Sequence, residues 1–408
     1  MESYKILDRC LTCDSTNLHK YLDLGTQPLA NDYPAAPCVQ EEFPLAVNLC
    51  KTCFHSQLTV AVAPDLMFKN YRYMTSATGK TSADYFTWFV ENAEKLKPNK
   101  KLKALDIASN DGHLLSFFKA KNHEVLGVDP AENLAAKANA EGIKTLCKYW
   151  TEEIAAQIDE TFDIISAMNV FAHNSDPYGF LLACKKVMDD DSLLFIQTSQ
   201  AEIFKNSEFD TVYHEHLSFF TAKSFKTLFE RVGLVIDYVE KVSIHGKSYL
   251  FRLKKAKTNA AHDASYVALY EQEKSWGFYD LAKYDSFAEK FSETAKQVNE
   301  ICDEYAAKGY EIVAYGAAAK SMTFINYAKP KIDYYIDETP LKMGRYTPGL
   351  NIPIHAPDEL LKTDTKKLII ITAWNFAEEI ANKAHKFMKN SKAEFKFATY
   401  FPKIKLWD

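Results

Sequence analysis

The sequence lacks an uninterrupted apolar run of about 18 residues, the length that a membrane-spanning helix needs. It also lacks an excess of basic residues, because 49 lysines and arginines stand against 54 aspartates and glutamates, for a net charge of −5. This balance argues against a protein that follows nucleic-acid phosphates. The opening MESYKILDRC has no cationic segment followed by an apolar run, as a signal peptide would have. We therefore expect a cytoplasmic protein with no nucleic-acid partner and no membrane partner.

No internal repeat or low-complexity segment is visible in the 408 residues, and 47% hydrophobic with 25% charged residues is ordinary for globular domains. The length suggests roughly two to four domains. Of the eight cysteines, four form two Cys-x-x-Cys pairs within the first 53 residues, and the other four, including Cys38, are single. This distribution favours a reducing compartment and a metal site over a disulfide framework.

The two cysteine pairs are Cys10 with Cys13 and Cys50 with Cys53, and 36 residues separate Cys13 from Cys50. Each pair can present two thiolates to one tetrahedral ion, which is typical of a closed structural zinc site. The alternative is redox pairs or unrelated thiols, but neither pair heads a helix in a thioredoxin-like context. We therefore predict structural Zn²⁺ with these four ligands.

Strands and helices alternate through most of the remaining chain. Residues 82–97 have helical spacing with Ser82 at the start. Short apolar runs of strand type follow, with the helical stretch 112–122 between the first two of them. This alternation predicts a parallel, doubly wound α/β sheet. Residues 262–308 are helical in period, and a second α/β domain is expected over roughly 305–408. The predicted strands cover residues 103–108, 123–129, 162–169, 191–199, 311–316, 331–337 and 366–374.

The first strand–turn–helix unit, ALDIASNDGHLL, carries an acid at a strand end, and the next strand ends in a second acid 23 residues later. An acid at the end of the second strand suits the ribose hydroxyls of a nucleoside. The turn is not G-x-G-x-x-G, and with one glycine it lacks the close backbone approach that a pyrophosphate requires. S-adenosylmethionine is therefore a better ligand than NAD. We predict that the cofactor contacts Asp106, Ala108, Asn110, Asp111, Gly112 and Asp129, with Asn169 and His173 after the strand FDIISAM.

A second strand–turn–helix unit, VAYGAAAKSMTFIN, brings Gly316 and small residues to a turn and Lys320 to a helix N-terminus, a setting that favours phosphate. The next strand ends at Asp337, 21 residues after Gly316. The following loop supplies cations and a tyrosine that suit a diphosphate with a stacked base, namely Lys342, Arg345 and Tyr346. The alternative is a structural domain with a solvated basic loop.

With both units in place, the chain resembles the S-adenosylmethionine-dependent nucleotide-sugar C-methyltransferases. The resemblance rests on both cysteine pairs and on NYRYMTSAT, LDIASNDG, YHEHLSFF, IHGKS, YGAAAK, IDETPLKMGRYTPGLNIPI and AWNFAEEI, in this order. It implies a zinc-binding domain at 1–64, a class I methyltransferase domain at 65–255, and a helical linker with a nucleotide-sugar-binding Rossmann-like domain at 256–408. It also implies methylation of carbon 3 of a 4-keto-deoxy sugar carried by dTDP, or by another carrier such as GDP, in the biosynthesis of deoxysugars for surface glycans or natural products.

The resemblance further implies catalytic roles for a tyrosine, a glutamate and a histidine of the Tyr-x-Glu-His segment, and for a tyrosine of the Tyr-x-Tyr stretch. These fall on Tyr213, Glu215, His216 and either Tyr71 or Tyr73. His245 and Ser248 stand at substrate-binding positions. The chain departs from the family where it reads HGKS in place of His-Gly-Gly-Ser, and QTS at residues 197–199 in place of an acidic E-x-P segment.

The chemistry requires a base near neutral pKa, because a 4-keto group acidifies the hydrogen on carbon 3 and its removal gives an enolate. Histidine suits that task, so we expect His216 to be the base, with Glu215 as the alternative. An extended YHEH segment would place Tyr213 and Glu215 on one side and His214 and His216 on the other, which disfavours a metal site. Alternatives to C-methylation are O- or N-methylation of a nucleotide sugar, an NAD-dependent sugar oxidoreductase, and a zinc-dependent binding protein without chemistry.

Overall fold

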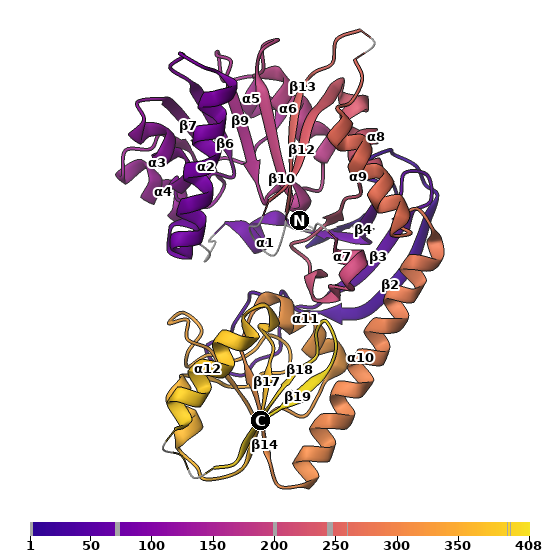
Figure 1. Ribbon diagram of the computed structural model, residues 1–408, viewed down its shortest axis with the longest axis vertical. Coiled ribbons are helices and arrows are strands. Elements are labelled where there is room, and N and C mark those ends of the chain that lie inside the picture. The colour runs from indigo at the N-terminus through magenta and orange to yellow at the C-terminus, as the bar shows by residue number, and fades with distance from the viewer. Residues whose placement is uncertain are drawn as a thin grey trace. The chain divides into compact units, whose positions relative to one another are not determined.

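The computed structural model describes residues 3–69, 74–198, 202–242, 248–258, 260–389, 391 and 393–408. The chain divides into two compact units, each assembled from separate stretches of sequence. Unit 1 comprises residues 1–19, 48–201 and 217–279, and unit 2 comprises 20–47, 202–216 and 280–408. Figure 1 shows both units, with the helices and many of the strands labelled.

Unit 1 is built on a mixed sheet which, over the described residues, has the order β12-β13-β10-β9-β6-β7-β8. The five strands from β10 to β8 are parallel, and β13 pairs antiparallel with both β10 and β12. The chain reverses direction across the sheet at β6, which has β7 on one side and β9 on the other. The bounds are β6 Lys103–Ile107, β7 Glu124–Val128, β8 Thr145–Leu146, β9 Ile164–Met168, β10 Leu193–Thr198, β12 Leu234–Val242 and β13 Ser248–Lys255.

Helices cover both faces of this sheet, which explains why central strands such as β10 are buried along their whole length. Residues of α2 and α3 pack on one face, and residues of α6, α8 and α9 pack on the other. The bounds are α1 Pro64–Phe68, α2 Lys80–Leu96, α3 His113–Ala120, α4 Glu132–Ala140, α5 Glu152–Ala155, α6 Pro177–Lys186, α8 Ala222–Val232 and α9 Ala264–Ser275, with 3₁₀ turns η1 Thr75–Thr78 and η2 Phe171–His173.

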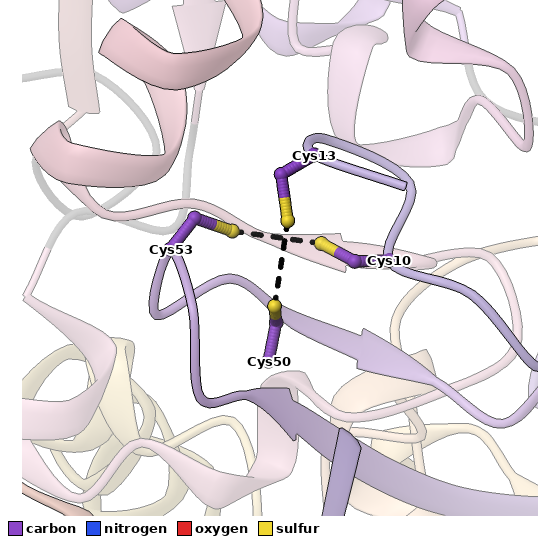
Figure 2. A group of neighbouring side chains, drawn as sticks. All are labelled: Cys10, Cys13, Cys50 and Cys53. Carbon is purple, nitrogen blue, oxygen red and sulfur yellow. Dashed lines mark hydrogen bonds between the residues drawn. The ribbon is translucent and has the colours of Figure 1, made fainter. Parts of the chain in front are cut away.

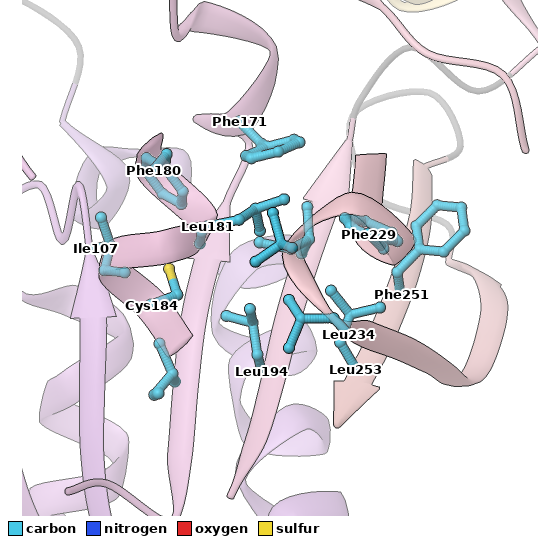
Figure 3. Packing of buried hydrophobic residues seen from close by; sticks show 14 of the residues in the cluster. Ile107, Phe171, Phe180, Leu181, Cys184, Leu194, Phe229, Leu234, Phe251 and Leu253 are labelled. Atoms are coloured by element: carbon cyan, nitrogen blue, oxygen red, sulfur yellow. The ribbon is translucent and has the colours of Figure 1, made fainter. Parts of the chain in front are cut away.

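The larger apolar core of unit 1 lies between β10, β13 and helices α6 and α8. Figure 3 shows Leu194 and Leu253 of the strands facing Leu181 of α6 and Phe229 of α8. All four side chains are fully buried. The strand–helix alternation seen in the sequence therefore corresponds to a doubly wound sheet with packed apolar residues on both faces, as predicted.

Two features of the N-terminal quarter of the chain differ from the sequence-based expectation. Helix α2 begins at Lys80, and Gly79 with a φ of 74° precedes it, so Ser82 lies inside the first turn instead of capping it. The sequence predicts no strand in the first 64 residues, yet they contain β1 Tyr4–Ile6, β2 Leu18–Gln27, β3 Phe43–Cys50, β4 Ser56–Leu58 and β5 Val60–Val62. Their burial does not alternate regularly along β2 and β3, so period-two patterning could not reveal them.

Unit 2 contains a sheet which, over the described residues, has the order β16-β15-β14-β17-β18-β19 and is parallel except for β19. The chain reverses direction at β14, between β15 and β17. The second predicted α/β domain is therefore present. Its strands are β14 Glu311–Tyr315, β15 Tyr334–Ile336, β16 Ile354–His355, β17 Lys367–Ile371, β18 Phe395–Thr399 and β19 Lys405–Trp407.

The predicted helical stretch 262–308 forms two helices, α9 in unit 1 and α10 Leu281–Ala307 in unit 2. Helix α10 buries Tyr284, Phe287 and Phe291 along one face. The other elements of unit 2 are α7 Ile203–Asn206, α11 Ala319–Ala328 and α12 Ala377–Met388, with 3₁₀ turns η3 Phe209–Thr211, η4 Pro357–Leu361 and η5 Trp374–Phe376. The short β11 Ser218–Phe219 pairs with β4 in unit 1.

Candidate active site and zinc centre

The four paired cysteines form a compact sulfur cluster in unit 1. Their Sγ atoms all lie within 4.8 Å of one another, and Figure 2 shows them converging on one point. Cys10 Sγ is 3.5 Å from Cys53 Sγ, and Cys13 Sγ is 3.5 Å from Cys50 Sγ. Sulfur ligands of a tetrahedral zinc ion are about 3.8 Å apart at a Zn–S length of about 2.3 Å. The cluster fits a zinc ion with four protein ligands and no open position, which makes the metal structural.

The backbone gives both cysteine pairs the same local shape. The residue after each second cysteine, Asp14 or Phe54, has a positive φ near 60°, and its amide donates to the carbonyl of Cys10 or Cys50. Thr12 Oγ1 lies 3.1 Å from Cys10 Sγ and 3.0 Å from Cys53 Sγ, where its hydroxyl can donate to thiolate. Such outer contacts orient metal ligands. The sequence spacing predicted the four cysteine ligands, whereas the contacts of Thr12 with two of them come from the structure alone.

In the first strand–turn–helix unit, three residues of the turn have a left-handed backbone conformation. Ala108, Asn110 and Gly112 have φ values of 56°, 54° and 77°. A left-handed alanine costs about 1–2 kcal/mol, so this position explains why glycine is usual where Ala108 stands. A Cβ on Gly112 would come within 3.2 Å of Ala138 Cβ, which leaves that position suited to glycine alone.

Acidic side chains hold this turn in shape. Asp129, at the end of β7, accepts from the amides of Asn110 and Ala131, each at 2.8 Å, and burial raises its pKa to about 6. Asp111 is buried and accepts from the Ser76 hydroxyl and, at 3.2 Å, from Lys137 Nζ. The strand reversal at β6 brings these groups to one edge of the sheet, where ligands bind in doubly wound folds.

Asp106 lies deeper, within β6. Ser166 Oγ of β9 donates to its Oδ1 at 2.6 Å, and burial raises the pKa of Asp106 to about 7. This bond joins the two strands at the reversal. Its predicted contact with the cofactor stays a prediction.

Two residues at the end of β9 had been predicted as cofactor ligands. Asn169 has a φ of 56°, and His173 is in η2, where its ring packs edge-on against Phe68 at 5.9 Å. Burial lowers the pKa of His173 to about 4, so the imidazole is neutral.

Gln197, at the end of β10, connects Asn169 to helix α2. Its Nε2 donates to Asn169 Oδ1 at 3.0 Å and its Oε1 accepts from Tyr85 OH at 2.6 Å. Gln197 is one of the positions at which the chain departs from the family pattern, and Tyr85 is not among the predicted site residues. The available signal was that Gln197 ends the strand beside β9, where its amide can both donate and accept.

In unit 2 the YHEH segment forms a turn, so the side-chain arrangement of an extended segment does not apply. The His216 amide donates to the Tyr213 carbonyl at 2.9 Å, and this bond folds the two side chains onto the same side. Tyr213 OH lies 2.8 Å from His216 Nε2, and the ring centroids are 4.1 Å apart. The turn is stable because it closes a hydrogen bond that an extended segment without a partner strand would leave unmade.

The other ring nitrogen of His216 meets the backbone, since Nδ1 lies 2.7 Å from the Thr211 carbonyl oxygen of η3. Glu215 Oε1 accepts from Asn31 Nδ2 at 2.5 Å. His214 is buried against Phe43, with Nε2 3.3 Å from the Phe43 carbonyl, and burial lowers its pKa to about 4. His214 is thus held as a neutral packing residue.

The turn after β14 in unit 2 is tightly fixed. Gly316 has a φ of 103°, and a Cβ there would lie 2.7 Å from Ala373 Cβ. The Ala317 amide donates to Asp337 Oδ2 at 2.8 Å, and the Ala317 carbonyl accepts from Lys342 Nζ at 2.7 Å. Asp337 also accepts from the Thr339 amide at 2.8 Å. Gly316, Asp337 and Lys342 therefore meet at the N-terminal end of α11, and their role in binding a ligand stays a prediction.

Three more predicted residues surround the same strand ends. Lys320 Nζ lies 6.0 Å from the centroid of the Trp374 ring, and Trp374 Nε1 donates to Asp210 Oδ2 at 2.5 Å. Arg345 Nη1 donates to the carbonyl of residue 33, and the Tyr346 amide donates to the carbonyl of residue 34.

Among the remaining predicted residues, Ser248 is buried at the start of β13 in unit 1. Tyr71, Tyr73 and His245 lie outside the described residues. Their roles, like those of the other predicted site residues and the domain boundaries, stay predictions.

Comparison with known families gives three successive matches. Residues 10–68 match a family described as "Putative zinc binding domain", residues 80–239 match "Methyltransferase domain", and residues 243–402 match "C-methyltransferase C-terminal domain". The order of these matches is that of the zinc cluster, the first strand–turn–helix unit and the second.

Among curated proteins, the C-methyltransferase NovU of Streptomyces niveus is 28% identical over 394 residues, which is 94% of each chain. A ubiquinone biosynthesis O-methyltransferase of Rhodopseudomonas palustris (strain BisB18) is 35% identical over 114 residues, 27% of this chain and 44% of that relative. The second match therefore spans less than half of the relative.

Solved structures match the chain over less than half of its length. The plantazolicin methyltransferase BpumL in complex with SAH is 13% identical and covers 42% of this chain and 82% of its own, with a TM-score of 0.34. A putative methyltransferase of Haloferax volcanii in complex with Trm112 is 12% identical and covers 43% of this chain and 92% of its own, with a TM-score of 0.35.

Over the part of the chain that the structure describes, no helix is both long and apolar enough to cross a membrane. Because the chain is shown to be a methyltransferase, the alternatives of an NAD-dependent oxidoreductase and of a binding protein without chemistry are set aside. The sulfur cluster, the doubly wound sheet and the three family matches together identify the chain as an S-adenosylmethionine-dependent methyltransferase with a structural zinc site, related to a C-methyltransferase over almost its whole length.

Proposed function

We propose that the protein methylates carbon 3 of a nucleotide-linked 4-keto-deoxy sugar through an enolate, with His216 as the proton acceptor. The observation that carries this proposal is the pair of contacts made by the His216 ring, Nδ1 to the Thr211 carbonyl and Nε2 to Tyr213 OH. A carbon acid needs a base with an available lone pair close to neutral pH, and O- or N-methylation makes no such demand.

The contacts define where the proton sits on the neutral ring. A carbonyl oxygen only accepts, so the bond to Thr211 requires the hydrogen on Nδ1 and leaves the lone pair on Nε2. Burial, together with the nearby charge of Glu215, raises the pKa of Tyr213 well above its usual value. The phenol therefore stays protonated and donates to Nε2, which is the basic nitrogen.

Two proton routes end at the same nitrogen. In the first, Nε2 takes the carbon 3 proton directly after Tyr213 turns its hydroxyl toward the sugar. In the second, the Tyr213 oxygen receives the carbon 3 proton while its own proton moves to Nε2. Either route leaves the electron pair of the C–H bond in the enolate and a positive charge on His216.

S-adenosylmethionine, when bound, supplies the electrophilic methyl group: a C–C bond forms at carbon 3, the C–S bond breaks, and sulfur keeps the bonding pair. The residues that we propose to hold it are those at the carboxyl ends of β6, β7 and β9, with the Asn110, Asp129 and Asn169 side chains providing hydrogen bonds. Asn169 is kept in place by Gln197.

The acceptor's nucleotide is proposed to bind at the N-terminal end of α11. The first amides of a helix and its positive dipole end favour phosphate, and Lys320 and Lys342 add positive charge. Supporting the proposal, the Ala317 peptide is fixed on its amide side by Asp337 and on its carbonyl side by Lys342.

The test is solvent-deuterium exchange at carbon 3 of a dTDP-4-keto-deoxy sugar, with S-adenosylhomocysteine in place of the methyl donor. The unchanged protein should exchange this hydrogen, and His216→Asn should lose most of both exchange and turnover while it binds S-adenosylhomocysteine normally. General-base removal typically costs about 100-fold to 10,000-fold in rate.

His214→Asn is the matched control, because His214 is a buried neighbour with no proposed part in proton transfer. It should keep exchange within about three-fold, although it loses packing worth about 1 kcal/mol. Normal exchange in His216→Asn combined with lost exchange in Glu215→Gln would assign the base to Glu215. Methyl transfer by the unchanged protein without any carbon 3 exchange would favour O- or N-methylation.

A further inference from the structure

Residues 31–40 belong to the region predicted as the zinc-binding domain, yet the structure places them against the C-terminal α/β part of unit 2. Tyr33 is buried, and its hydroxyl donates to the Ala317 carbonyl at 2.7 Å. Arg345 Nη1 donates to the Tyr33 carbonyl at 3.0 Å, and the Tyr346 amide donates to the Pro34 carbonyl at 3.0 Å. We call residues 31–40 the docking segment.

The far end of the docking segment is held by a second set of bonds. Asn351 accepts from the Cys38 amide at 3.1 Å and donates to the Cys38 carbonyl at 3.0 Å. The Gly349 amide donates to Gln40 Oε1 at 2.9 Å. The docking segment is therefore fixed along the basic loop 342–351 at several successive points.

The near end of the docking segment reaches the YHEH turn. Asn31 Nδ2 donates to Glu215 Oε1 at 2.5 Å, and Tyr33, two residues on, is close enough to Tyr213 to contribute to its raised pKa. Tyr33 and Lys342 donate to the same oxygen, that of Ala317, and Lys342 Nζ lies 5.4 Å from the Tyr33 ring centroid. One short segment thus contacts both the proposed proton acceptor's turn and the proposed nucleotide turn.

We infer that Asn31 and Tyr33 are positioning residues of the proposed acceptor site, Asn31 through Glu215 of the YHEH turn and Tyr33 for the nucleotide. This inference rests on the proposed function. Asn31 gives the Glu215 carboxylate a hydrogen-bond donor, which fixes the direction of that side chain beside Tyr213 and His216. Tyr33 fixes the Ala317 carbonyl, and with it the peptide that leads into α11.

The two residues should affect different kinetic constants. Loss of a hydrogen bond to a charged group costs about 10-fold to 100-fold, so Asn31→Ala should lower kcat and carbon 3 exchange by that factor, with KM for the sugar within about three-fold. Tyr33→Phe removes a bond between neutral groups, so it should weaken dTDP binding by about 3-fold to 10-fold and leave kcat within about three-fold.

A pH profile separates positioning from general structural damage. Asn31→Asp keeps the shape of the side chain but faces Glu215 with a second carboxylate, and two carboxylates that share a site raise one pKa strongly. The acidic limb of the kcat profile should move upward by about one pH unit. Asp32→Asn is the control, because Asp32 is exposed, is one residue along, and its carboxylate accepts from Gln40 of the same segment. It should leave the profile in place.

The measurements are dTDP and S-adenosylhomocysteine titration, kcat and KM, and carbon 3 exchange, with zinc content and melting temperature as folding checks. Unchanged kcat and exchange in Asn31→Ala, or unchanged dTDP affinity in Tyr33→Phe, would overturn the inference for that residue. Equal losses of every constant in both variants would show a purely structural segment. Absence of carbon 3 exchange in the unchanged protein would instead overturn the proposed function, and the dTDP titration of Tyr33→Phe would still decide the docking of the nucleotide.

Discussion

At the scale of the residue, the contacts of single amides and ring nitrogens define what the site can do. His216 carries its hydrogen on Nδ1 because a carbonyl faces that atom, and Gln197 orients Asn169 because its amide donates on one side and accepts on the other. Buried groups of this kind are costly to leave unpaired, about 1–3 kcal/mol each. His216 therefore leads to a prediction about the proposed acceptor site, and Gln197 leads to a separate prediction about the proposed methyl-donor site.

Substitution of Gln197 tests the proposed S-adenosylmethionine site. Gln197→Leu leaves Tyr85 OH and Asn169 Oδ1 without their partner, so we expect S-adenosylhomocysteine affinity to fall about 10-fold and the free energy of unfolding to fall by about 1–3 kcal/mol. Isothermal titration and urea denaturation measure the two quantities. Gln197→Glu is the control: it still accepts from Tyr85, and Asn169 can turn its amide to donate, so binding should change by less than about three-fold. Equal affinity in the leucine variant would remove Asn169 from the donor site.

At the scale of the element, helix α8 depends on a carboxyl from its neighbour α9. Glu273 is buried, and its Oε2 accepts from the amide of Ala222, the first residue of α8, and from Tyr279 OH, each at 2.7 Å. The side chain caps the helix beyond its own capping box of Thr221 and Ser224. Burial raises the pKa of Glu273 from its usual 4.5 to about 8.

The raised pKa predicts how stability depends on pH. Between about pH 4.5 and 8 the folded protein binds this proton more tightly than the unfolded chain, so the free energy of unfolding falls as pH rises. One proton contributes at most about 1.4 kcal/mol per pH unit. Glu273→Gln should therefore reduce the difference between urea midpoints measured at pH 5 and pH 8. Glu271→Gln, an exposed carboxylate of the same helix, should leave that difference as it is. A Glu273→Gln variant that keeps the full pH dependence of stability would contradict the assignment of this proton to Glu273.

At the scale of the whole molecule, the zinc cluster closes a long loop of the chain. Thirty-six residues separate Cys13 from Cys50, and this loop contains the docking segment. Metal-binding free energy contributes to folding where no preformed site exists in the unfolded chain. The zinc ion is thus expected to stabilise a segment that contacts the proposed acceptor site.

Zinc removal should therefore weaken the binding of the nucleotide more than the binding of the methyl donor. We expect Cys13→Ser to contain less than half a zinc per chain by metal analysis, to melt at least about 5 °C lower, and to bind dTDP several-fold more weakly. Its affinity for S-adenosylhomocysteine should stay within about three-fold. Cys147→Ser, an exposed cysteine outside the cluster, should match the unchanged protein. Full nucleotide affinity in a zinc-free variant would separate the zinc cluster from the acceptor site.

Local patterns in the sequence determined the features that depend on near neighbours. The Cys-x-x-Cys spacing predicted the zinc ligands, because two residues between cysteines suffice to direct both thiols to one ion. Alternating apolar runs and helical periods predicted both α/β sheets, because parallel strands are buried on both faces. The acids Asp129 and Asp337 could be located for the same reason, since each directly follows a strand whose end is visible in the sequence.

Tertiary structure alone decided the features that join distant residues. Asn31 meets Glu215 across 184 positions and Tyr33 meets Ala317 across 284, and no period in the sequence records such pairs. The YHEH segment contains the expected side chains, but only the hydrogen bond that closes its turn brings Tyr213 to His216 Nε2. The sequence by itself therefore determined which chemical groups are present, and the fold decided their direction and protonation, because both depend on contacts that form only when the chain is compact.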